Sequence, residues 1–181
     1  MHLKRTFDFS SFTVMICTPS EFACGLMSDM CRAMRFKAVI SKLDFVAAWD
    51  TFKTNPIDIM FGDVVAEDGY RLLKEVRTAE ISPNPHIPYI ATALAVSSSC
   101  IARARDTGAT EFLRFPLSAE RLIERIVHVV DHPRAFVKAA GYTGPDRRRK
   151  HAPIQGDDRR RRTSGAPDAS DNLGQRGKAD S

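Results

Sequence analysis

The sequence of 181 residues has no long hydrophobic run, which argues against a membrane-spanning protein. Its longest apolar stretch, residues 87–96, has ten residues and contains a proline, so it is too short for a transmembrane helix. Residues 2–8 are mostly polar or charged and lead into no apolar run, so no secretory signal is expected. We therefore expect a cytoplasmic protein that has no membrane partner.

Cysteine and histidine are sparse and poorly spaced for metal binding. The four cysteines are Cys17, Cys24, Cys31 and Cys100. No pair has the Cys-x-x-Cys spacing of metal and redox sites, so we expect small buried side chains in a reduced compartment. His128 and His132 lie four residues apart, but no cysteine or carboxylate is spaced to join them. No metal cofactor is therefore expected.

The excess positive charge lies in one short segment. Residues 1–140 contain 17 Lys and Arg against 16 Asp and Glu, whereas residues 141–163 contain 8 against 3. This segment holds a duplication with an offset of twelve, GPDRRR at 144–149 and GDDRRR at 156–161. It has too few apolar residues to bury a core. We expect it to be disordered until an anionic partner orders it, and the tail 164–181 to be disordered as well.

Upstream of this segment, short apolar runs alternate with amphipathic stretches. Five strands are expected at residues 13–17, 37–40, 57–62, 89–93 and 111–114. Because these runs are apolar on both faces, they predict a five-stranded parallel sheet of the α/β class, with helices covering both faces. In such folds the functional loops meet at the carboxyl ends of the strands.

The helices are predicted from their four-residue apolar spacing and their capping signals. They are expected at residues 19–35, 41–54, 69–78, 97–106 and 118–130. Thr18 is expected to cap the first helix, with Pro19 in its first turn. The face of this helix that is expected to pack on the sheet carries Phe22, Leu26, Met30 and Met34.

Several short motifs within residues 12–130 resemble one family of bacterial signalling domains. They are DIMFGD at 58–63, DGY at 68–70, IPY at 87–89, DTGA at 106–109 and FP at 115–116. Together they resemble the CheY-like receiver domain. The resemblance implies a flavodoxin-like receiver over residues 12–140, with residues 1–11 as an N-terminal extension. It also places Asp63 at the phosphoacceptor position and Thr92 at the hydroxyl position of the fourth strand.

The rest of the receiver's phosphorylation site is missing from the sequence. The loop 17–20 (CTPS) has no carboxylate where the family has its Mg²⁺-binding acidic pair, and Phe115 stands where the family has a lysine. Phosphoryl transfer to a carboxylate depends on Mg²⁺ and a cation that neutralise the developing charge. We therefore expect Asp63 to be a remnant phosphoacceptor and the protein to have no enzymatic activity.

Four interpretations of the arginine segment are compatible with its composition. It could be a solvated basic tail, a localisation motif, or a binder of RNA or DNA phosphates. Pure phosphate binding gains nothing from the interspersed carboxylates, so nucleic acid is disfavoured. The fourth interpretation is a guanine nucleotide. The arginine fork matches guanine O6 and N7, aspartate accepts from the N1 and N2 hydrogens, and Tyr142 can stack on the base. The duplication suits the two identical halves of cyclic di-GMP.

A degenerate receiver followed by an arginine-rich segment resembles the Cle family of CheY-like proteins. The resemblance implies that residues 141–163 bind cyclic di-GMP and that the protein then engages the flagellar motor switch or a cell-pole protein, in control of motility and attachment. Recruitment to the flagellated pole or motor would follow. The implied ligand contacts are Tyr142, Gly144, Pro145, Asp146, Arg147, Arg148, Arg149, Gly156, Asp158, Arg159, Arg160 and Arg161. The alternatives are a phosphorylation-switched single-domain response regulator and a basic-tail nucleic-acid binder.

Overall fold

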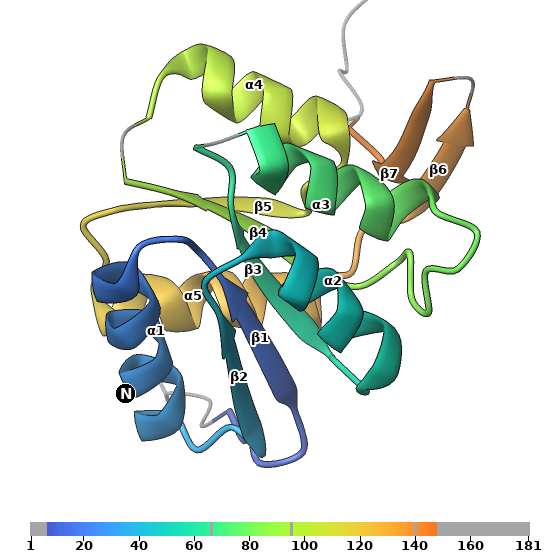
Figure 1. Cartoon of the computed structure of the whole chain (residues 1–181). Coiled ribbons are helices and arrows are strands. Elements are labelled where there is room, and N and C mark those ends of the chain that lie inside the picture. The colour runs from blue at the N-terminus through green and yellow to red at the C-terminus, as the bar shows by residue number, and fades with distance from the viewer. Residues whose placement is uncertain (1–6, 66, 95, 140, 148–181) are drawn as a thin grey trace, which may run out of the picture. The chain divides into compact units, whose positions relative to one another are not determined.

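The computed structural model describes residues 7–65, 67–94, 96–139 and 141–147. Its centre is a parallel sheet of five strands in the order β2-β1-β3-β4-β5 (Figure 1). The strands are β1 (Thr13–Cys17), β2 (Ala38–Lys42), β3 (Ile59–Asp63), β4 (Tyr89–Ala93) and β5 (Glu111–Arg114). Strands β1, β3 and β4 are buried along their whole length, as their continuous apolar runs predict.

Five helices connect the strands and cover both faces of the sheet. They are α1 (Glu21–Ala33), α2 (Phe45–Thr54), α3 (Glu67–Thr78), α4 (Ser98–Thr107) and α5 (Ala119–Asp131). Helices α1 and α5 share one apolar core with the sheet, and α2, α3 and α4 share another on its opposite face. Figure 1 shows the two layers of helices. The predicted α/β class, parallel sheet and helices on both faces are confirmed.

Helix α1 buries a different face from the predicted one. Phe22 is 73% exposed, while the buried side chains include the smaller Ala23, Cys24 and Cys31. These small residues let the helix approach the sheet closely. Leu26, Met30 and Met34 pack only at the edge of the core. The prediction followed the largest apolar side chains, and it was wrong for Phe22.

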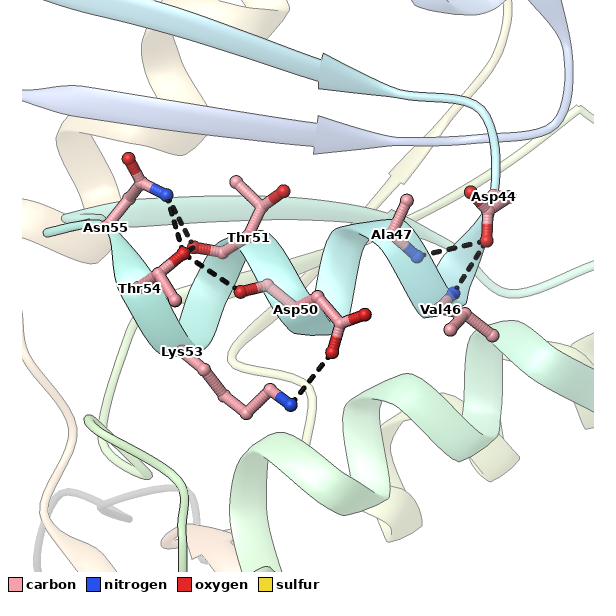
Figure 2. Close-up of polar contacts among 8 residues, drawn as sticks. All are labelled: Asp44, Val46, Ala47, Asp50, Thr51, Lys53, Thr54 and Asn55. Atoms are coloured by element: carbon pink, nitrogen blue, oxygen red, sulfur yellow. Dashed lines mark hydrogen bonds and ion pairs between the residues drawn. The ribbon is translucent and has the colours of Figure 1, made fainter.

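The first residues of α1 and α2 also differ from the prediction. Ser20, rather than Thr18, caps α1 by accepting a hydrogen bond from the Ala23 amide at 3.2 Å. Strand β2 continues to Lys42, and α2 begins after Asp44, not at Ser41. The Asp44 carboxylate accepts from the amides of Val46 and Ala47 (Figure 2). This is a strong N-cap because one charged oxygen satisfies two free donors of the first turn.

A hairpin follows α5 and extends the receiver into the arginine segment. Strand β6 (Phe136–Ala139) pairs antiparallel with β7 (Tyr142–Pro145). The Asp146 amide closes the pair by donating to the Ala135 carbonyl at 2.7 Å. The expectation that the segment is disordered from residue 141 therefore does not hold for residues 141–147. Their composition is polar and predicts no packed structure, whereas in the fold they pair with β6 and Arg147 contacts Asp106 of α4.

Candidate functional site

Asp63 lies at the carboxyl end of β3 and is only 3% exposed. Its Oδ2 accepts a hydrogen bond from the Thr18 hydroxyl at 2.9 Å, and its Oδ1 accepts from the Val65 amide at 2.9 Å. Thr92 lies beside it on β4, in register across the pair. The carboxylate is thus held by one neutral hydroxyl and one backbone amide. Neither group supplies the positive charge that phosphoryl transfer to a carboxylate depends on.

The two positions that carry charge in the receiver family are apolar or neutral here. Phe115 is buried in the core shared with α1 and α5. Thr18, in the loop after β1, is also buried and uses its hydroxyl on Asp63. Within the described ranges, no cluster of three or more His, Cys, Asp or Glu could hold a metal ion. That Asp63 is a remnant stays a prediction that a phosphate analogue can test.

The tyrosine of the IPY motif lies on β4, the strand next to that of Asp63. Tyr89 of β4 is fully buried, and its hydroxyl has no hydrogen-bond partner among the described residues. The ring occupies the space that a side chain at position 62 would need, so Tyr89 fits only because residue 62 is glycine. Burial raises the pKa of the Tyr89 phenol, which stays neutral. The tyrosine fills the core shared with α2, α3 and α4 and adds no charge to the Asp63 site.

The second candidate site is the described part of the first motif copy, residues 144–147, which begins on β7. The Tyr142 hydroxyl donates to the Pro145 carbonyl at 2.7 Å, so the ring folds back over its own strand. The Arg147 guanidinium lies 4.0 Å from the centroid of this ring. Arg147 Nη1 also donates to Asp106 Oδ1 of α4 at 2.7 Å. The motif therefore presents an arginine stacked on an aromatic ring and paired with a carboxylate of the receiver.

A close backbone approach seats this hairpin on the receiver. Gly144 faces Gly108, and a Cβ built at Gly144 would lie 2.9 Å from the Gly108 Cα. Gly108 ends α4 in a left-handed conformation, with φ 111°, which favours glycine. Its amide donates to the carbonyls of Ala104 and Arg105. The end of α4 is thus rigid, and the hairpin fits against it through two residues without side chains.

A buried arginine contacts both the end of α4 and the hairpin. Arg77 of α3 is 2% exposed and donates to the carbonyls of Gly108 and Pro85 at 2.9 and 2.8 Å. Its guanidinium also lies 5.1 Å from the Phe136 ring centroid of β6, which is within cation–π range. Burial lowers the pKa of Arg77 to about 10, so the side chain remains charged at neutral pH. Arg77 thereby joins α3, the start of β5 and the hairpin.

The structure describes five of the predicted ligand contacts, namely Tyr142, Gly144, Pro145, Asp146 and Arg147. The others lie outside the described residues: Arg148, Arg149, Gly156, Asp158, Arg159, Arg160 and Arg161. Asp63 stands at the carboxyl end of its strand, whereas Gly108 and Thr110, under the hairpin, precede β5. Because the strands are parallel, the two candidate sites lie at opposite ends of the strands, Asp63 at the carboxyl ends and the hairpin site at the amino ends.

Sequence reasoning missed three residues that shape the hairpin site, Arg77, Asp106 and Phe136. Asp106 lies in the DTGA motif, which had been used only as a mark of the fold. Arg77 resembled an ordinary helix cation, because no charge partner is spaced to identify it as buried. Phe136 was an isolated aromatic residue after a proline. Their roles arise from contacts between residues 30 or more positions apart, such as Arg77 with Gly108.

Comparison with known proteins identifies the fold. Neither protein-family models nor curated proteins give a match to this sequence. Among solved structures, a response regulator from Thermotoga maritima matches with a TM-score of 0.59 at 20% identity, covering 67% of this chain and 98% of its own. The signal receiver domain of a DNA-binding response regulator from Colwellia psychrerythraea matches with 0.60 at 18% identity, covering 67% and 100%.

A chemotaxis protein from Vibrio cholerae, CheY4, gives a similar result. Its TM-score is 0.59 at 19% identity, and the match covers 66% of this chain and 98% of that protein. Identities this low establish the fold alone. In the part of the chain that the structure describes, no helix has the length and apolar character needed to cross a membrane. The chain thus has the fold of the CheY-like response-regulator receiver domains.

Proposed function

We propose that this protein is a cyclic di-GMP-binding adaptor in which the arginine segment, rather than Asp63, receives the signal. The observation that carries the proposal is the first copy of the motif, where Arg147 stacks on Tyr142 at the receiver surface. The same sequence pattern recurs twelve residues later. The described part of the first copy, residues 144–147, therefore sits on the folded domain, and the second copy begins at residue 156 of the sequence.

The chemistry of this motif suits a guanine nucleotide. An arginine presents parallel donors that match guanine O6 and N7 or a phosphodiester, and a tyrosine offers a stacking surface. Asp146 adds an acceptor for the hydrogens on guanine N1 and N2. A duplicated set suits a ligand with two guanines and two phosphodiesters. The likeness to the Cle family supports the same ligand.

The ordered hairpin also affects the expected affinity. Fixing a backbone residue costs roughly 1–2 kcal/mol, and residues 142–145 are already held by the β6–β7 pairing. Each base or phosphate pair contributes about 1–3 kcal/mol, so affinity of micromolar order or tighter is expected.

On this proposal the receiver fold serves as the output module and has no enzymatic activity. The contacts of Asp63 support an input other than phosphorylation, because its oxygens are satisfied by the Thr18 hydroxyl and the Val65 amide. The partner would be the flagellar motor switch or a cell-pole protein, reached in the cytoplasm and at the flagellated pole. Residues on the α4-β5-α5 side, such as Arg121 and Arg125 in α5, are exposed and available for that contact.

The proposal is tested by calorimetric titration of the full chain with cyclic di-GMP, using GTP and an RNA oligomer as competing ligands. Arg159→Ala and Asp146→Ala should each weaken binding by about 1–3 kcal/mol, as expected for a lost base or phosphate pair. Arg32→Ala in α1 is the matched control, since it removes an exposed arginine far from the motif in sequence. Tighter binding by Asp146→Ala, or equal competition by RNA, would show that the segment is a general anion binder.

A further inference from the structure

Arg147 is engaged on both its edge and its face. Its Nη1 donates to Asp106 Oδ1 at 2.7 Å, while the centre of the guanidinium lies 4.0 Å from the Tyr142 ring centroid. The side chains are 43% and 49% exposed for Arg147 and Asp106, so a nucleotide could reach this pair from solvent. The groups that the proposed ligand needs are thus accessible but already paired with one another.

A purine cannot enter this arrangement without moving the arginine. Stacked atoms stay about 3.5 Å apart, so a base between Arg147 and Tyr142 would need a separation of roughly 7 Å. The observed separation is 4.0 Å. A ligand that stacks on this face of Tyr142 must therefore displace the guanidinium. A ligand that pairs with the Nη1 edge must displace Asp106.

The release of Arg147 would leave Asp106 with another cation. Arg105 Nε lies 3.2 Å from Asp106 Oδ1 in the same helix. The hydrogen bond from Arg147 is the largest cause that lowers the pKa of Asp106, and the hydrogen bond from Arg105 adds to it. The carboxylate is exposed and keeps a partner after the exchange, so the closed arrangement is easily reversed.

We propose that Asp106 of the receiver competes with the nucleotide for Arg147 and thereby sets the affinity of the first motif copy. Ligand binding replaces the Asp106 carboxylate by a guanine edge or a phosphodiester. The inference rests on the proposed function.

The test compares cyclic di-GMP affinity of the full-length wild type with that of Asp106→Asn, which keeps the shape and removes the charge. Exposed ion pairs contribute little, so Asp106→Asn should bind about two- to five-fold more tightly. Asp29→Asn is the matched control, because Asp29 forms a similar exposed pair with Arg32 in α1. Its affinity should equal that of the wild type.

A double variant separates direct competition from a general change in charge. In an Arg147→Ala background, Asp106→Asn should no longer change the affinity, because the group for which Asp106 competes is gone. If Asp106→Asn binds as the wild type does or more weakly, or tightens binding equally without Arg147, this inference is wrong and the proposed function stands. If the wild type does not bind cyclic di-GMP, the proposed function fails and the inference fails with it.

Discussion

Replacing Gly144 by alanine should detach the hairpin from the receiver while removing no polar group. The added Cβ would lie 2.7 Å from the Tyr142 hydroxyl and 2.9 Å from the Gly108 Cα, against an ordinary contact of at least 3.4 Å. The hairpin must therefore move by about 0.5 Å away from Gly108, since the hydrogen bonds of Gly108 hold the end of α4 in place. Within the hairpin, the Tyr142 hydroxyl must move by about 0.7 Å. Overpacking of this kind costs about 1–3 kcal/mol.

The assay for Gly144→Ala combines hydrogen–deuterium exchange with denaturant unfolding. Amides of β6 and β7, and that of Asp146, should exchange faster, while β1, β3 and β4 keep their protection because they are buried in the sheet. The free energy of unfolding should fall by no more than about 1–3 kcal/mol, the cost of overpacking between the hairpin and α4. The substitution adds a single methyl group and changes nothing else.

Gly25→Ala is the matched control for this experiment. Gly25 lies on the exposed side of α1, and no atom lies within 4 Å of a Cβ built there. The same substitution should therefore stabilise the protein by about 0.5–1 kcal/mol, through helix propensity alone. Unchanged hairpin exchange and unchanged stability in Gly144→Ala would refute the close fit between Gly144 and Gly108.

Three further predictions concern other parts of the receiver. Arg77→Ala should lower the free energy of unfolding by about 3–5 kcal/mol, measured with denaturant, because it leaves buried carbonyls without donors and opens a cavity. Mg²⁺ with beryllofluoride should leave the amide spectrum almost unchanged around Asp63, and shifts spreading from there to α5 would restore the response-regulator interpretation. Burial raises the pKa of the Cys17 and Cys31 thiols to about 12, so both should stay unmodified by N-ethylmaleimide at pH 8 in the native protein. Mass spectrometry should find Cys100 modified first, because it alone of the four is partly exposed.

The sequence by itself determined the layered architecture. The predicted bounds of β1, β4 and β5 match the observed strands residue for residue. The reason is local, since buried strands bounded by turn residues leave a clear pattern that needs no knowledge of distant contacts. The position of Asp63 at a strand end followed in the same way. The duplicated motif is also a property of the sequence, and its second copy lies outside the described residues.

Tertiary structure decided which side chains of a helix are buried and which distant segments pack together. The buried face of α1 excludes Phe22, because Ala23 and Cys24 pack more closely on the sheet. The hairpin of β6 and β7 packs on residues that are distant in the chain: Phe136 lies against Arg77, and Gly144 lies against Gly108. The spacing and composition of residues in the sequence do not predict such long-range contacts. The arginine motif could therefore be predicted as a binding segment, whereas its attachment to α4 could be found only from the folded domain.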